Sequence, residues 1–576
     1  MAKAKSSRSG SGIVVPDGLG GALDMGGIGI ATHIHSDRHH YQAIKGARRR
    51  IKAATYLFII CFAVLSARLV TVMLLNGEAA GPDQLTSVSA RVRGDLIDRN
   101  DALLATNLAS LSLYADTREI WNPGVTTAAL VEVLPDLDEM DILQKLTSGS
   151  HSIQLVRYLT PVQKQLIFDL GLAGLSFPQV ERRIYPRGRD AAHVIGYVNA
   201  DNKGISGVEQ SLNEFIVQAG LGGDKVALSL DMRVQHVVQD ELARAMEKFS
   251  AIGGAGLVLD VRNGEVLAMA SLPDFNPNGS QTPIEKTHFN RVTKGNYEMG
   301  SVFKMFTVAM ALDAGVVTMN DGYDASRPIL IGSAKINDYH GKNRWLSIPE
   351  IFAYSSNIGT VKIASDVGIP QHQNFLRSMG MYQRVPIELT EVSMPKVPSR
   401  WRKIRAATIS YGHGISVSPL HMARAAGALV NGGLLVEPTI LKREKSDAPP
   451  VVRVISKATS VQMRQLLRLV VTDGTARQAD VEGYNVGGKT GTADKYNSPE
   501  RLNTFVATFP IQDPQYVVLM MLDEPHGIAE TSGFATAGWT TAPLARDVIS
   551  RIGPLLGVTP QKKTTDRYQK ASLTLP

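Results

Sequence analysis

The chain has 576 residues, 44% hydrophobic and 20% charged, which excludes a single small domain and a wholly disordered or fibrous protein. Its net charge of +8 comes largely from residues 1–52, which hold nine Lys or Arg and three Asp, so no basic face extends over a folded domain and we expect no nucleic-acid partner. The single cysteine, Cys61, excludes an internal disulfide.

The first element is a polar, basic tail over residues 1–51, which we predict to be cytoplasmic and largely disordered. It contains HIHSDRHH at 33–40, where four histidines could bind a metal ion. Because a disordered segment supplies no fixed ligand geometry, we expect solvated side chains there and no metal.

An apolar run follows over residues 52–75 and has the length of one membrane-spanning helix. ARRRIK at 47–52 leads into it, whereas NGEAAGPDQ at 76–84 follows it without Lys or Arg. This asymmetry predicts a single span with the tail inside and the rest of the chain outside. A buried core helix or a cleaved signal peptide fits less well, because the flanks follow the charge rule and the preceding tail is long.

Residues 76–225 are rich in strand-like pieces and turns and carry no recognisable catalytic set. The alternation in RVRGDLIDRNDALLATN at 91–107 predicts a hairpin. Pro and Gly in ERRIYPRGRDAAHVIGYV at 181–198 precede another strand-like run. We therefore expect a mixed α+β, non-catalytic pedestal.

Residues 226–556 have the pattern of a larger α/β domain, and 557–576 that of a flexible tail. Asn263-Gly264 lies between two apolar stretches, which is typical of a β-hairpin. YEMGSVFKMFTVAMALDAG at 297–315 predicts a buried helix that ends at a glycine. Helical spacing predicts an earlier helix with one apolar face, formed by Val234, Val238, Leu242, Ala245 and Phe249.

Ser301 and Lys304 are three residues apart and would share one helical face. Burial disfavours a charged lysine, so an apolar helix would lower the lysine pKa and let it accept the serine proton. Ser301 would lie near the helix start, where the dipole favours an oxyanion. The S-x-x-K spacing alone is weak, because such common residues also meet it by chance.

A second pair, Ser355 and Asn357, forms S-x-N in AYSSNIGTVKIA at 353–364. A hydroxyl and an amide at this spacing could relay a proton and hold a substrate amide. By itself the pair is equally an N-cap, for which Ser and Asn are favoured.

The segment GYNVGGKTGTADK at 483–495 fits two chemistries, a phosphate-binding loop and the K-T-G motif of acyl-transfer enzymes. A phosphate loop must open into a helix, but Gly491, Asn497 and Pro499 disfavour one there. The apolar stretches 504–510 and 515–522 are joined by a short turn, which predicts an antiparallel meander rather than a parallel crossover. The context therefore favours K-T-G.

The ordered set of S-x-x-K, S-x-N and K-T-G-T resembles the penicilloyl-serine transferases, and specifically the class B penicillin-binding proteins. The similarity runs from about residue 50 to 550. RGDLIDRN at 93–100 and GVEQSLN at 207–213 look like the pedestal of that class, and YEMGSVFK at 297–304 and GGKTGTA at 487–493 look like its transpeptidase domain. The resemblance implies an antiparallel sheet flanked by helices, without a cofactor.

The resemblance also implies peptidoglycan D,D-transpeptidation through an acyl-enzyme on Ser301. Lys304 would be the base, and Ser355 would relay a proton with Lys489. Asn357 would hold the donor peptide, and the N–H groups of Ser301 and Thr492 would form the oxyanion hole. The residues expected to receive the terminal carboxylate are Lys489, Thr490, Gly491 and Thr492.

The family further implies stem peptides as substrates, β-lactams as inhibitors, and a bacterial inner-membrane location with the catalytic domain in the periplasm. A membrane-embedded glycan polymerase and other septal division proteins would be partners, because the Ser-Ser-Asn motif is more similar to septal than to elongation members. The alternatives are an elongation-type transpeptidase, a non-catalytic division scaffold, or a β-lactam receptor. A β-lactamase is disfavoured, because its E-x-x-L-N string occurs here at Glu209, before Ser301.

Overall fold

The computed structural model describes the residue ranges 52, 55–67, 93–279, 285–444, 446–496 and 498–561. It divides into two units, residues 1–86 and 87–576. In the first unit, residues 55–67 form a helix. Within the described ranges no helix is both long enough and apolar enough to span a membrane. The predicted tail 1–51, parts of the predicted span (53–54 and 68–75) and residues 562–576 lie outside those ranges.

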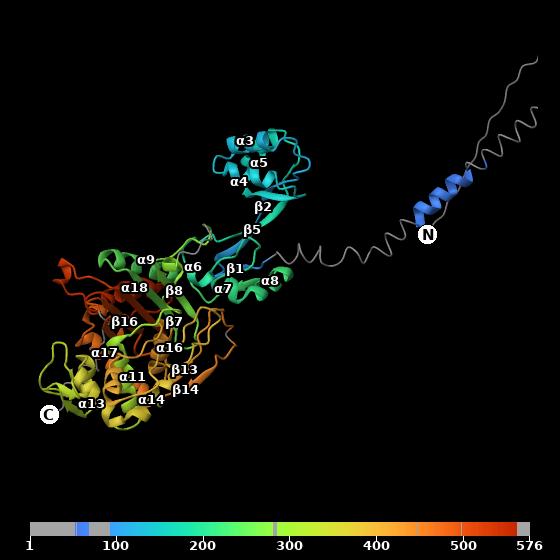
Figure 1. Cartoon of the computed structure of the whole chain (residues 1–576). Coiled ribbons are helices and arrows are strands. Elements are labelled where there is room, and N and C mark those ends of the chain that lie inside the picture. The colour runs from blue at the N-terminus through green and yellow to red at the C-terminus, as the bar shows by residue number, and fades with distance from the viewer. Residues whose placement is uncertain are drawn as a thin grey trace, which may run out of the picture. The chain divides into compact units, whose positions relative to one another are not determined.

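The first part of the second unit is the mixed α+β region that the sequence predicts (Figure 1). Asp98 accepts hydrogen bonds from the backbone N–H groups of Asn100 and Ala102, both at 2.8 Å, and so closes the predicted hairpin of β1 and β2. The elements of this mixed α+β region are β1 (Asp95–Ile97), β2 (Leu103–Ala115), α3 (Pro123–Val133), α4 (Glu139–Leu146), β3 (Ile153–Leu159), α5 (Pro161–Asp169), β4 (Leu175–Ser176), β5 (Gln179–Ile184), α6 (Ala192–Ile195), α7 (Gly207–Ser211), α8 (Asn213–Gly222) and β6 (Lys225–Ala227).

A buried ion cluster joins three segments of this pedestal that are far apart in sequence. Arg93 donates from Nε to Glu209 Oε2 at 2.9 Å, and Arg183 donates from Nε to Glu209 Oε1 at 2.8 Å. All three side chains are excluded from solvent. Arg93 Nη1 also donates to Asn213 Oδ1 at 2.7 Å. Two guanidinium groups thus share one carboxylate, and a buried charge is tolerated because it is paired.

The remainder of the unit is built on a five-stranded, fully antiparallel sheet in the order β15-β16-β17-β7-β8. The hairpin at Asn263-Gly264 and the 504–522 meander are both confirmed. The C-terminal strand β17 pairs along its whole length with β7, so the two ends of the domain meet in the middle of the sheet. These strands are β7 (Gly253–Asp260), β8 (Val266–Leu272), β15 (Gly487–Asp494), β16 (Arg501–Phe509) and β17 (Tyr516–Asp523).

Helices cover the sheet in two layers, with α9 and α18 packed together in one and α16 and α17 in the other (Figure 1). The predicted apolar face of α9 is buried, because its residues pack on β7 and β8. The helices are α9 (Met232–Lys248), α10 (Glu285–His288), α11 (Lys304–Asp313), α12 (Ile348–Ala353), α13 (Asn357–Val367), α14 (Ile369–Ser378), α15 (Lys403–Ser410), α16 (Pro419–Val430), α17 (Lys457–Thr472) and α18 (Thr541–Leu555).

Short strands and 3-10 turns complete the domain around this sandwich. They are η1 (Gly300–Phe303), β9 (Gly322–Asp324), β10 (Ile329–Ile331), β11 (Ala334–Ile336), β12 (Trp345–Ser347), β13 (Leu434–Val436), β14 (Val451–Arg453), η2 (Arg477–Ala479) and η3 (Ala529–Thr531).

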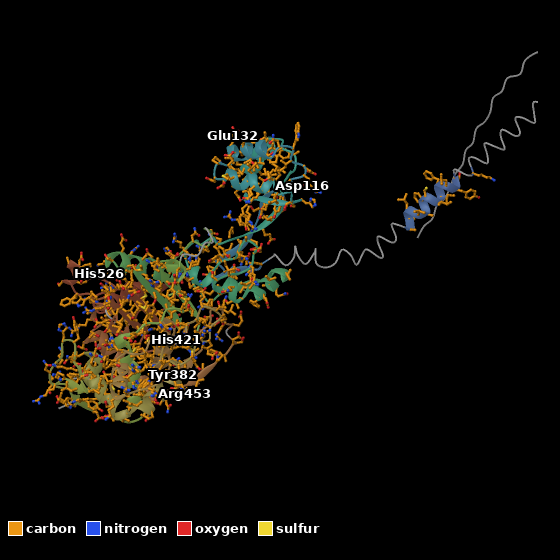
Figure 2. All side chains as sticks on the ribbon, in the orientation of Figure 1. Asp116, Glu132, Tyr382, His421, Arg453 and His526 are labelled. Atoms are coloured by element: carbon orange, nitrogen blue, oxygen red, sulfur yellow. The ribbon has the colours of Figure 1, made fainter. Side chains whose placement is uncertain are left out.

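One buried histidine of the helical layers has structural partners at both ring nitrogens. His421, labelled in Figure 2, lies on α16 with Nδ1 2.7 Å from Ser418 Oγ and Nε2 2.9 Å from the Gln383 carbonyl oxygen. Burial lowers the pKa of His421 to about 4, so the ring is neutral. Both ring nitrogens are occupied by the helix start and a neighbouring loop, which assigns His421 to packing rather than to chemistry.

Candidate active site

Ser301 lies in the 3-10 turn η1, and Lys304 is the first residue of α11. The predicted helix over 297–315 is therefore confirmed from residue 304 to its end, where Ala314 is the C-cap and the left-handed Gly315 follows, as predicted. It begins later than predicted because Gly300 has φ +55°, which an α-helix cannot accommodate. Ser301 is partly exposed, whereas Lys304 is completely buried.

The serine turn is held against the edge strand β15 by two glycines. A Cβ on Gly300 would come within 2.5 Å of the Thr492 carbonyl oxygen, and one on Gly491 within 2.3 Å of the Met299 carbonyl oxygen. Only residues without a Cβ allow such a close approach of the two backbones. Ser301 is thereby fixed beside the K-T-G-T segment, although almost 200 residues separate them in the sequence.

Ser355 lies between the two lysines of the motifs. Lys304 Nζ donates to the Ser355 carbonyl oxygen at 2.5 Å and to its Oγ at 3.1 Å, and Lys489 Nζ donates to the same Oγ at 3.0 Å. Ser355 has φ +60°, a left-handed conformation that is uncommon for a serine. Such strained residues concentrate at functional sites, and this one places a single hydroxyl within reach of both amines.

Both lysines are fully buried, and both have lowered pKa values. Burial holds the pKa of Lys304 well below its usual 10.5, and the neighbouring Lys489 lowers it further. Burial lowers the pKa of Lys489 to about 7. Near neutral pH the pair therefore includes an unprotonated amine, which is the state that a general base requires.

In the S-x-N motif, the helix cap is a different residue from the two that the sequence analysis considered. The residue that caps α13 is Ser356, whose Oγ accepts from the N–H of Gly359, so neither Ser355 nor Asn357 is the cap. Asn357 Nδ2 donates to the Asn337 carbonyl oxygen at 3.0 Å. With the cap between them, Ser355 is left to face the lysines.

Asp338 supports this motif and was not anticipated from the sequence. Its carboxylate accepts from Ser356 Oγ at 2.7 Å and from the N–H of Ile358 at 2.9 Å. Its charge also opposes the lowering of the Lys304 pKa. No spacing rule connects Asp338 to the three motifs, so only the folded chain reveals it.

The hydroxyls of the third motif point away from Lys489, because neighbouring side chains in a strand alternate between faces. Thr490 Oγ1 lies 2.6 Å from Thr475 Oγ1, and Thr492 Oγ1 accepts from the N–H of Ala537 at 3.0 Å. Thr490 is buried and Thr492 partly exposed. Thr475 and Ala537 are contacts that sequence reasoning missed.

The phosphate-loop interpretation of 483–495 fails on this geometry. Lys489 lies inside strand β15, followed by five more strand residues, and not at the start of a helix. Its Nζ is directed to Ser355 and the Thr490 carbonyl oxygen.

Two known domain families match long segments of the chain. Residues 254–549 match the penicillin-binding protein transpeptidase domain, and residues 89–216 match the penicillin-binding protein dimerisation domain. The chain belongs to the class B penicillin-binding proteins. The resemblance that the motifs suggested is thus confirmed.

Relatives of this penicillin-binding protein cover most of its length. It is 40% identical over 526 residues to the probable peptidoglycan D,D-transpeptidase FtsI of Caulobacter vibrioides, covering 89% of each chain. It is 30% identical to the probable peptidoglycan D,D-transpeptidase PenA of Neisseria meningitidis over 90% of this chain and 94% of the relative. It is also similar in structure to penicillin-binding protein 3 of Mycobacterium tuberculosis complexed with aztreonam, with TM-score 0.63, 25% identity, and coverage of 82% and 97%.

Glu209 has a structural place in this penicillin-binding protein. Its carboxylate is bound by two buried pedestal arginines, Arg93 and Arg183. The E-x-x-L-N string is therefore part of the pedestal and does not supply a deacylating glutamate to Ser301.

Proposed function

We propose that this protein is a peptidoglycan D,D-transpeptidase of the septal type, acting through an acyl-enzyme on Ser301. The observation that carries the proposal is the buried Lys304–Ser355–Lys489 cluster, with two amines of lowered pKa on one hydroxyl. The similarity to the FtsI relative supports the septal assignment.

In the acylation step, Ser301 Oγ attacks the carbonyl carbon of the penultimate D-alanine of a stem pentapeptide. The serine proton passes to unprotonated Lys304, which lies one helical turn away. The peptide C–N bond then breaks, and the leaving D-alanine nitrogen takes up a proton. Since both amines donate to Ser355 Oγ, Ser355 can pass its hydroxyl proton to that nitrogen and be reprotonated by Lys304, which holds the proton taken from Ser301.

The developing oxyanion is stabilised by the backbone N–H groups of Ser301 and Thr492, which belong to the turn and strand that the two glycines bring together. Lys489, Thr490, Gly491 and Thr492 provide the strand along which the substrate carboxylate binds. Thr492 is the more accessible of the two threonine hydroxyls, because Thr490 is buried against Thr475. Asn357 holds the donor peptide amide.

In the second step, the amine of a neighbouring stem peptide attacks the ester carbonyl, Ser301 leaves as its hydroxyl, and a cross-link forms. The active-site lysines now accept the proton of the attacking amine. No metal or cofactor is required, because the proton transfers and the oxyanion stabilisation are supplied by side chains and backbone N–H groups.

We also propose the cellular arrangement that the sequence indicates: a cytoplasmic tail over 1–51, one span over 52–75, a pedestal over 76–225, a transpeptidase domain over 226–556 and a tail from 557. The domain would lie on the periplasmic side of the inner membrane. A membrane-embedded glycan polymerase and septal division proteins are its proposed partners.

The test is covalent labelling with a fluorescent penicillin. The wild type should become labelled on Ser301, and Ser301→Ala should lose both labelling and cross-linking of stem peptides. Ser550→Ala, an exposed serine on α18, serves as the matched control and should behave as the wild type. Cross-linking that survives Ser301→Ala would favour the scaffold or receptor alternative.

A further inference from the structure

A cavity of about 260 Å³ lies where the pedestal strands β3 and β5 meet the segment that follows β8. Its wall includes three arginines, two tyrosines and an amide: Arg157, Arg182, Arg183, Tyr158, Tyr185 and Asn278. It shares no residue with the Lys304–Ser355–Lys489 cluster. Among the described residues that line it there is no carboxylate.

The three arginines are incompletely paired. Arg182 makes no ion pair with any described residue, and its guanidinium lies over the Tyr158 ring at 5.0 Å from the centroid. Arg157 Nη1 donates to the Ala200 carbonyl oxygen at 2.5 Å. The Nη2 atom of Arg183 is buried and has no hydrogen-bond partner within the described part of the chain.

The nearest carboxylate does not neutralise this wall. Glu209 is already shared between Arg183 and Arg93, so the buried cluster keeps an excess positive charge. Glu181 on β5 is exposed to solvent overall. Partial burial of its carboxyl group raises its pKa, whereas the charge of Arg183 lowers it. Arg157 is exposed and Arg182 half-buried, so water screens part of the repulsion among the three arginines, and an anion between them would offset the remainder.

The cavity wall is held in a defined shape. Asn278 clamps Tyr185 from both sides, since its Oδ1 accepts from the Tyr185 N–H at 2.9 Å and its Nδ2 donates to the Tyr185 carbonyl oxygen at 2.8 Å. The Tyr185 hydroxyl accepts from the Val198 N–H at 3.1 Å. A prearranged wall lowers the entropy cost of binding a ligand.

We propose that this cavity is an oxyanion-binding site, recognising a carboxylate or phosphate group through Arg182 and Arg157. Planar guanidinium groups bind both kinds of oxyanion in a bidentate manner, and a cavity of this size accepts one such group with its immediate substituent. The site binds independently of acylation at Ser301.

The test is isothermal titration of the full chain with inorganic phosphate and, separately, with citrate, each against chloride at equal ionic strength. We expect saturable binding and at least a tenfold weakening in both Arg182→Gln and Arg157→Gln. These two positions are chosen because Arg183 braces the buried cluster and its replacement could prevent folding. Stronger binding of citrate than of phosphate would identify carboxylates as the natural ligand class, and the reverse would identify phosphates.

Arg546→Gln, an exposed arginine on α18, is the matched control and should bind as the wild type. Penicillin labelling should stay unchanged in all three variants, so a failure here is distinguishable from a failure of the proposed function. The proposal is overturned if neither anion binds saturably, or if Arg182→Gln and Arg157→Gln bind as tightly as the control.

Discussion

Two buried cationic clusters in this protein handle the same physical problem in opposite ways. In the proposed active site, Lys304 and Lys489 are fully buried, and no carboxylate of the described residues is bonded to either amine. In the pedestal, Arg93 and Arg183 are fully buried around the carboxylate of Glu209. Both clusters remove positive groups from water, which is costly for any ion that keeps its charge.

The difference follows from the chemistry of the two side chains. A buried lysine can lose its proton. Burial therefore lowers its pKa, and the neutral amine can act as a base. An arginine keeps its charge in proteins, so its burial demands a partner and gives rigidity instead of reactivity. The choice of lysine or arginine therefore separates the proposed catalytic cluster from the structural one.

The largest expected effect is on the catalytic cluster. Lys304→Met removes the amine while keeping a similar volume, and it should lower the rate of acylation by a fluorescent penicillin about 10²–10⁴-fold, the range typical of a lost general base. The free energy of unfolding should change little, because no carboxylate of the described residues is bonded to Lys304 and so none loses its partner. A variant that acylates within a few-fold of the wild type would refute the role of Lys304.

The pedestal cluster should respond in the opposite manner. Glu209→Gln leaves two buried guanidinium groups without a carboxylate and should cost about 3–5 kcal/mol of stability, measured by urea unfolding. The acylation rate of the folded fraction should remain that of the wild type. Glu214→Gln, an exposed glutamate on α8, is the control. Equal unfolding midpoints for both variants would contradict the comparison.

The pH dependence distinguishes the clusters further. Because Ser355 would relay a proton with Lys489, whose pKa is about 7, protonation of Lys489 should slow acylation as the pH drops below 7, by up to about tenfold per pH unit. The unfolded chain keeps this proton up to about 10.5, so the lowered pKa should make the free energy of unfolding rise with pH between about 7 and 10.5. Lys489→Met should flatten that rise, and an unchanged slope would argue against a titrating buried lysine.

The smallest effect is expected for an exposed pair in the same pedestal. Asp116, labelled in Figure 2, bonds to Arg118 at 2.8 Å, and this hydrogen bond lowers the pKa of Asp116 to about 2. Solvent screens such pairs, so Arg118→Gln should leave the urea midpoint unchanged. A clear loss of stability would show that an exposed ion pair in this protein can contribute as much as a buried one.

Much of the catalytic domain could be predicted because its signals are local. The hairpin at Asn263-Gly264, the meander of β16 and β17, and the apolar face of α9 each depend on short-range periodicity or turn chemistry. The predicted start of α11 was wrong because Gly300 is left-handed. Its conformation depends on close packing against the distant Thr492 and not on its neighbours in the sequence. The positions of Asp338 and Thr475 were missed for the same reason.

The sequence by itself determined the order and chemistry of the three motifs and the kind of fold that carries them, because residue type and spacing are written along the chain. Only the tertiary structure decided that Ser355, in a strained conformation beside the Ser356 cap, lies between Lys304 and Lys489. Contacts between segments far apart in sequence, and the loss of water around two amines, arise only when the chain is folded.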